Sequence, residues 1–357
     1  MNRYLILAAS MSVLGFASAH AQTFPSPSFD NSARITQTGN ANDAEIDQAV
    51  GGVINGQGSA EIIQTGNGND ASITQTNATS PFLAGFANTA LIDQRRARGD
   101  ASIDQIHDYF LNRFNNALIV QITPDATASI QQRGDRNTGT IRQLNGSVAP
   151  VANIDQNGRT NTAIVRQTGA NGVVDVVQGT FNNGAGISPQ TFTSRVEVDN
   201  DGLNADIYVS QLGNNHNAFI LEDGVNGVIN VSMAGASNLV TVNQESFNGL
   251  VEITSTGTSF SNAVEVIQAS SDDGSVARVN QSGGYAGSDI EQLDGVLGGG
   301  GNLAEVDQSG FGNGTGDIYS SILQNGGTNT ALVDQASTYA QSGIIQTGTG
   351  HLANIAQ

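Results

Sequence analysis

The stretch ITQTGNANDAEIDQ, residues Ile35–Gln48, contains the pattern from which the rest of the chain is built. Its fixed positions are Gln37, Gly39, Asn42, Ala44, Ile46 and Gln48. Three other stretches carry the same residue types at the same spacing, with Val allowed in place of Ile. They comprise Gln64, Gly66, Asn69, Ala71, Ile73 and Gln75; Gln156, Gly158, Asn161, Ala163, Val165 and Gln167; and Gln324, Gly326, Asn329, Ala331, Val333 and Gln335.

The second half of this unit alternates in the way that a half-buried β-strand does. Ala44, Ile46 and Gln48 fall on one face of a strand, and Glu45 and Asp47 fall on the other. We therefore expect Ala, Ile, Gln and the preceding Asn to point inward and the acids to face water. A helix is excluded because the period is two residues, and because a Gly in every unit would cost a helix about 1 kcal/mol each. The Gly and Asn tolerate positive φ and are expected to form the turn.

The unit recurs along almost the whole chain. We mark the closing residue of each unit, from Gln37 to Gln357; sixteen of the twenty-five spacings between these residues are 11 residues long. So persistent a period is typical of a repeat protein. The remaining spacings are longer, and the first three of them follow every second unit, which predicts insertions on one edge of a coil.

One strand and one bend per unit predict an all-β fold. Two units of 11 residues would form one strand–turn–strand coil of about 22 residues. Stacked coils, about 4.8 Å apart as in cross-β structures, would give a β-solenoid. Each inward Gln and Asn would then lie beside its equivalent in the next coil. A ladder of identical amides can satisfy both the donors and the acceptor of each buried amide.

Composition narrows the possible functions. The chain has no Cys, so disulfides cannot stabilise it, and its formal net charge of −19 includes 13 basic residues, all of them Arg. An acidic chain without a basic patch argues against nucleic-acid partners and against binding to anionic membranes. No later segment approaches membrane-spanning length, so no membrane insertion is expected.

The N-terminus has the features of a secretory signal peptide, which predicts export. Arg3 supplies the positive charge, an apolar run follows, and a small-x-small site predicts cleavage between Ala21 and Gln22. The expected division is a signal peptide (1–21), a linker or tail (22–34) and a repeat region (35–357). Within the repeat region, residues of about 179–255 are degenerate, because the closing Gln is often replaced there.

The pattern Gln-x-Gly-x-x-Asn-x-Ala-x-x-x-Gln resembles the curlin repeat of curli fibre subunits, over nearly the whole region from Ile35 to Gln357. The resemblance implies a bacterial functional amyloid that forms extracellular fibres of the biofilm matrix and takes part in surface adhesion. Implied partners are copies of itself, a nucleator subunit and an outer-membrane curli secretion channel. This chain departs from the family in having about 13 coils where typical subunits have about five repeats, and in less uniform spacing.

No catalytic or metal-binding pattern stands out in the sequence. His107, His216 and His351 share no metal-ligand spacing, and the last two replace the turn Asn of the unit, so they read as polar turn residues. Gly66–Asp70 differs in period from calcium-binding repeats. There is no pairing of a nucleophile with a base, so we expect neither an enzyme nor a cofactor.

Two functions remain open at this stage. The first is end-to-end self-assembly into extracellular fibres, favoured because the motif runs to Gln357 with no capping element after it. The alternative is a monomeric secreted adhesin or binding module. Its ligand contacts would lie in loops such as Asn77–Thr89 and Phe181–Thr193, which carry Phe82, Phe86, Phe181 and Phe192.

Overall fold

The fold is described from a computed structural model of the whole chain. The residues it describes are 8–11, 18–23, 32–50, 58–77, 88–107, 115–144, 149–167, 172–179, 194–200, 206–214, 217–222, 228–236, 238–244, 250–255, 262–269, 275–282, 286–293, 301–309, 318–336 and 340–357. Two compact units divide the chain. The first comprises Met1–Asn171 with Asn182–Pro189, and the second comprises Gly172–Phe181 with Gln190–Gln357.

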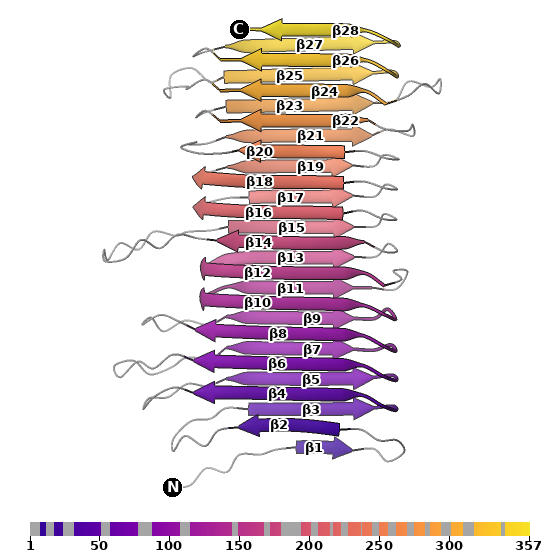
Figure 1. The fold of residues 1–357 in the computed structure, drawn as a ribbon, viewed down its shortest axis with the longest axis vertical. Coiled ribbons are helices and arrows are strands. Elements are labelled where there is room, and N and C mark those ends of the chain that lie inside the picture. The colour runs from indigo at the N-terminus through magenta and orange to yellow at the C-terminus, as the bar shows by residue number, and fades with distance from the viewer. Residues whose placement is uncertain are drawn as a thin grey trace, which may run out of the picture. The chain divides into compact units, whose positions relative to one another are not determined.

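The first unit consists of two stacks of parallel strands, and the chain alternates between them (Figure 1). In one stack the order is β1 (Ala8–Met11), β3 (Ser32–Thr38), β5 (Ser59–Thr65), β7 (Thr89–Gln94), β9 (Asn116–Gln121), β11 (Thr138–Gln143) and β13 (Asn161–Gln167). In the other it is β2 (Ser18–Thr23), β4 (Asp43–Val50), β6 (Asp70–Asn77), β8 (Asp100–His107), β10 (Thr127–Asp135) and β12 (Val151–Arg159).

The second unit repeats this arrangement. Its even-numbered strands are β14 (Val173–Gly179), β16 (Asp206–Asn214), β18 (Val228–Ala236), β20 (Leu250–Ser255), β22 (Val276–Gln281), β24 (Leu303–Gln308), β26 (Thr330–Gln335) and β28 (Leu352–Ala356). Its odd-numbered strands are β15 (Ser194–Asn200), β17 (Asn217–Glu222), β19 (Leu239–Gln244), β21 (Ala263–Ala269), β23 (Ala286–Leu293), β25 (Ile318–Asn325) and β27 (Gln341–Thr347). Strands β15 to β20 keep the parallel pairing although they lie in the degenerate section.

The predicted all-β solenoid fold is confirmed. Within each unit, strands pair in parallel with the strand two elements away, so two consecutive strands make one coil. The register places Ala44 on Ala71, Ile46 on Ile73 and Gln48 on Gln75. This register holds although the separation between hydrogen-bonded glutamines in adjacent coils varies from 22 to 33 residues. Extra residues are therefore accommodated between strands, and every strand presents the same face inward.

The core is narrow and built from small aliphatic side chains. Along β3 and β5 buried residues alternate with exposed or half-buried ones, as the period of two predicts. Ile46, Ile73 and Ile103 are at most 1% exposed, and they stack directly on one another in β4, β6 and β8. Such a core has no room for aromatic residues, which explains why the chain carries so few.

The solenoid begins before the first predicted repeat. β3 starts at Ser32, three residues earlier than the expected boundary at Ile35. Strands β1 and β2 pair with β3 and β4, and they contain Ala21 and Gln22, the two residues of the predicted cleavage site. The signal peptide stays a prediction, and residues 24–31 of the expected linker lie outside the described part of the chain.

Within the described residues, no helix is long and apolar enough to cross a membrane.

Candidate functional site

The inward glutamines of the first unit form two continuous hydrogen-bonded ladders. In the odd-numbered strands each side-chain Nε2 donates to the Oε1 of the next glutamine at 2.8 to 3.0 Å, in the order Gln37, Gln64, Gln94, Gln121, Gln143 and Gln167. In the even-numbered strands the distances are 2.8 Å, and the order is Gln48, Gln75, Gln105, Gln132 and Gln156. Every amide therefore donates toward the C-terminal coil, which gives the ladders a direction.

The second N–H of each glutamine connects the two stacks of strands. Gln64 Nε2 donates to the backbone carbonyl of Asp43 at 2.7 Å, from β5 to β4. In the same way Gln75 Nε2 reaches the carbonyl of Ser59 at 3.3 Å, from β6 to β5. One amide group thus donates both to the glutamine of the next coil and to a backbone carbonyl of the other stack. The amide pattern of the sequence does not reveal this cross-coil contact, because the acceptor is a backbone group.

In the second unit the ladders are interrupted in the degenerate section. Gln178 donates to Gln211 at 3.1 Å, and the next positions in the register are Met233, Ser255 and Gln281. Farther along the chain, glutamine–glutamine bonds form two more ladders. Their members are Gln268, Gln292, Gln324 and Gln346 in the odd-numbered strands, and Gln281, Gln308, Gln335 and Gln357 in the even-numbered strands.

Three of the ladder glutamines have a buried oxygen without a donor. The Oε1 atoms of Gln48, Gln268 and Gln281 are buried and make no hydrogen bond. Gln281 follows Ser255 in the register, so no glutamine N–H from the preceding coil reaches its oxygen. A buried acceptor left unpaired costs roughly 1–3 kcal/mol, and interruptions of the ladder are therefore unfavourable.

Asparagine does not form an amide ladder like that of glutamine. Asn42 Oδ1 accepts the backbone N–H of Asn69 at 3.1 Å, and its Nδ2 donates to the carbonyls of Thr38 and Gly66 at 3.3 and 3.0 Å. The side chain is one methylene shorter than that of Gln, so it bonds to the nearby turn backbone. The same acceptor role belongs to Asn69, Asn88, Asn115, Asn137, Asn302 and Asn329.

The turn geometry explains the glycine but corrects the prediction for asparagine. Gly39 has a φ of 118°, and a Cβ there would lie 1.8 Å from the carbonyl oxygen of Gly66 in the next coil. Positive φ occurs again not at Asn42 but at the residue before it, Ala41, with a φ of 54°. Asn42 is buried and lies directly before β4, so the turn requires its side chain rather than its backbone freedom.

The predicted inward residues are all buried, with exposures of 7% or less; they are Gln37, Asn42, Ala44, Ile46, Gln48, Gln64, Asn69, Ala71, Ile73, Gln75, Gln156, Asn161, Ala163, Val165, Gln167, Gln324, Asn329, Ala331, Val333 and Gln335. The glycines Gly39, Gly66, Gly158 and Gly326 have positive φ. The sequence reasoning missed Ser288 and Ser320, inward hydroxyls that contact the ladder amides of Gln281 and Gln308. The alternation of their strands could have identified them.

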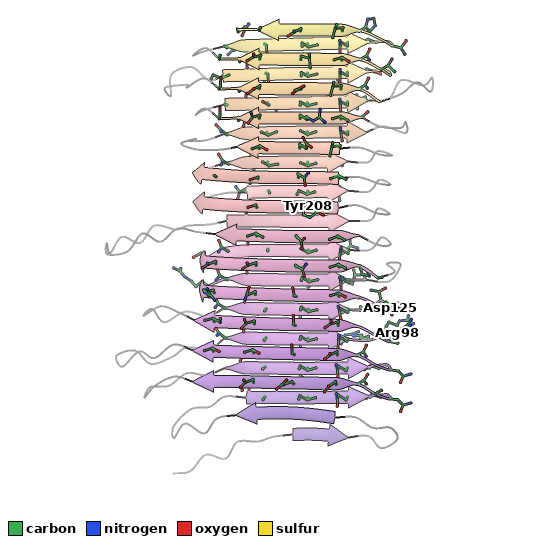
Figure 2. All side chains as sticks on the ribbon, viewed as in Figure 1. Arg98, Asp125 and Tyr208 are labelled. Carbon is green, nitrogen blue, oxygen red and sulfur yellow. The ribbon has the colours of Figure 1, made fainter. Side chains whose placement is uncertain are left out.

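Charged side chains lie on the outward face of the coils. Asp43, Asp70 and Asp100 stack in register, and burial together with the charges of Asp100 and Asp43 raises the pKa of Asp70. Opposite charges also meet between coils: Arg98 Nε lies 2.8 Å from Asp125 Oδ1, and both side chains project from the turns (Figure 2). Such exposed pairs contribute little to stability.

No group of three or more His, Asp or Glu side chains that could hold a metal ion occurs in the described part of the chain. Neither the known protein-family models nor the curated proteins contain a match to this sequence. The ordered feature that remains as a candidate for function is the ladder system together with the coil edges at which it ends.

The ladder predicts the effect of Gln75→Leu. This change removes the acceptor of Gln48 Nε2, the donor to Gln105 Oε1 and the bond to the Ser59 carbonyl. We expect the free energy of unfolding to fall by about 2–4 kcal/mol, because buried polar groups lose their partners. Denaturant titration followed by circular dichroism measures this. Thr74→Leu, on the exposed side of the same strand, is the control; an equal loss in both variants would contradict the ladder.

The interruption at Met233 and Ser255 predicts that the effects of replacing these two residues on stability are coupled. Ser255→Gln alone only moves the unpaired oxygen one coil back, whereas adding Met233→Gln completes a ladder from Gln211 to Gln281. In a double-mutant cycle, we expect the pair to be more stable than the sum of the single changes by about 1–2 kcal/mol.

The matched control is the same pair of replacements at Ser232 and Thr254, which lie opposite each other on the outward face of these strands. There a coupling close to zero is expected. A coupling equal to that of the inward pair would show that the effect does not come from the buried ladder.

Proposed function

We propose that this protein is a structural, self-assembling protein of the curlin-like class, which adds copies of itself end to end to build extracellular fibres for a biofilm matrix and surface adhesion. The observation that carries the proposal is the directional, in-register glutamine ladder, whose geometry can continue from one chain into another. Export by the predicted signal peptide, passage through an outer-membrane curli secretion channel and a nucleator subunit belong to the proposal through the family resemblance.

The last coil supports the proposal because its strands pair on one side only among the described residues. β27 pairs with β25, and β28 pairs with β26. Gln357 N–H donates to the carbonyl of Asp334, and Gln357 accepts from Ala336 N–H. Since N–H direction alternates along a strand, the N–H groups of Leu352, Asn354 and Ala356 point away from β26. Such a row of open groups is a template for another strand.

The exposed apolar side chains of this coil are consistent with addition of another copy. Ile345 and Leu352 are 77% and 74% exposed, more than the other large exposed apolar residues among the described part of the chain. The contacts of the alternative adhesin function were expected in loops with Phe82, Phe86, Phe181 and Phe192, and these residues lie outside the described part. No described contact favours that alternative, and none favours catalysis.

Fibre formation is the direct test. Purified processed chain (Gln22–Gln357), incubated with and without seeds, is expected to bind thioflavin T and to give fibres with a meridional diffraction reflection at about 4.7–4.8 Å, the spacing of paired strands. Small-angle scattering of the same sample follows the loss of monomer. A chain that remains a stable monomer under all these conditions would favour the adhesin over the fibre subunit.

The open edge predicts a second outcome. Asn354→Pro removes one N–H that points away from β26, and proline is tolerated at a strand edge that faces solvent. We expect an unchanged far-UV circular dichroism spectrum for the monomer and at least a tenfold slower elongation from seeds, because the incoming strand lacks a donor. The control is Asn354→Ala, which keeps the N–H. Equal elongation of the two variants would rule out β28 as the site of addition.

A further inference from the structure

In the last turn His351 stands where the repeat pattern has Asn. The imidazole reproduces one asparagine contact: His351 Nε2 lies 3.0 Å from the carbonyl oxygen of Thr347, four residues earlier. The side-chain amides of Asn42 and Asn137 donate in the same way to the carbonyls four residues before them, at 3.3 and 3.1 Å. Because a carbonyl only accepts, Nε2 carries the hydrogen and Nδ1 has the lone pair.

The other asparagine contact is the one that joins successive coils. In the coil below, Asn329 Oδ1 accepts the backbone N–H of His351 at 3.0 Å, as Asn42 Oδ1 accepts that of Asn69. A further coil would bring its own backbone N–H to His351. The neutral ring offers Nδ1 as the acceptor, whereas the imidazolium has two N–H donors and no acceptor.

We propose that His351 Nδ1 accepts the backbone N–H of Asn42 from a second copy, so that protonation of His351 weakens end-to-end addition. The inference rests on the proposed fibre function and names the contact at the junction. In the processed chain the strands that would meet are β27 with β3 and β28 with β4, since predicted cleavage removes β1 and most of β2, which pair with β3 and β4.

The two ends match in register. Gln346 and Gln357 are 11 residues apart, as are Gln37 and Gln48, and the turn between the strands has the same length. When these glutamines are aligned, Ile344 falls opposite Ile35 and Ile355 opposite Ile46, so the apolar core continues across the junction. The His351 position then falls opposite Asn42, as Asn329 falls below His351 within the chain.

Few charged groups face this junction. His351 is the only titratable side chain in 340–357 and in the turn 325–329 below it, and Asp334 is the only one on β26. The incoming edge brings Asp43, Glu45 and Asp47 of β4 and Arg34 of β3. Asp43 lies next to the junction and would attract an imidazolium, but it is exposed and its charge is screened. The facing N–H groups, in contrast, are left without an acceptor.

The test compares His351→Asn with the wild type in seeded elongation of the processed chain at pH 7.5 and pH 5.0. Imidazoles change charge in this interval, and asparagine does not. Taking the ratio of the two rates at each pH cancels the effect of pH on the other charges. We expect the variant-to-wild-type ratio to rise about tenfold between pH 7.5 and pH 5.0, because only the wild type loses its acceptor.

The matched control is His216→Asn, the same replacement in the connection between β16 and β17 inside the chain, for which the ratio is expected to stay constant. A ratio for His351→Asn that is equal at both pH values, with fibres forming normally, would overturn the junction contact and leave the proposed function intact. Absence of fibres from all three chains at both pH values would overturn the proposed function as well.

Discussion

The structure depends on one requirement: a glutamine amide buried between two sheets must find partners for its two N–H groups and its oxygen. Gln64 meets it by bonding to Gln37 and Gln94 in the neighbouring coils and to the Asp43 carbonyl across its own coil. These partners exist together only when the same residue returns in register at every coil. The repeat is therefore a consequence of burying the amide, and a chain without it would leave buried polar groups unpaired.

The turns follow from the same register. Neighbouring coils approach so closely at Gly39 that no side chain fits, and Asn42 after this turn bonds to the backbone of the turn in the next coil. Connections elsewhere are less constrained, because they lie beyond the ends of the strands. Adjacent coils can therefore be separated by 22 residues or by 33 while the ladder glutamines still pair.

In the proposed fibre, the direction of the ladder would link stability to assembly. All of the described glutamine–glutamine bonds donate toward the C-terminal coil, and the oxygen of Gln281, which follows Ser255 in the register, is buried and unpaired. An interrupted ladder and the final coil are chemically alike, because in both a glutamine amide lacks a glutamine partner in the next coil. An interruption inside the chain lowers stability, and in the proposed fibre a second copy would supply the missing partners at the final coil. The outward Asp stack adds charge without disturbing either.

The sequence by itself determined the strands, the inward set such as Ala44, Ile46 and Gln48, and the glycine at each turn, because alternation and backbone sterics act within a few residues. Only the tertiary structure decided which groups form hydrogen bonds with the inward Asn and Gln side chains. The coil-to-coil bond of Asn42 and the cross-coil bond of Gln64 join groups that lie 27 and 21 residues apart in the sequence. For the same reason His351 looked like an ordinary turn residue. Its ring contacts the Thr347 carbonyl and its backbone N–H donates to Asn329 Oδ1, and the proposed role of its other ring nitrogen depends on both contacts.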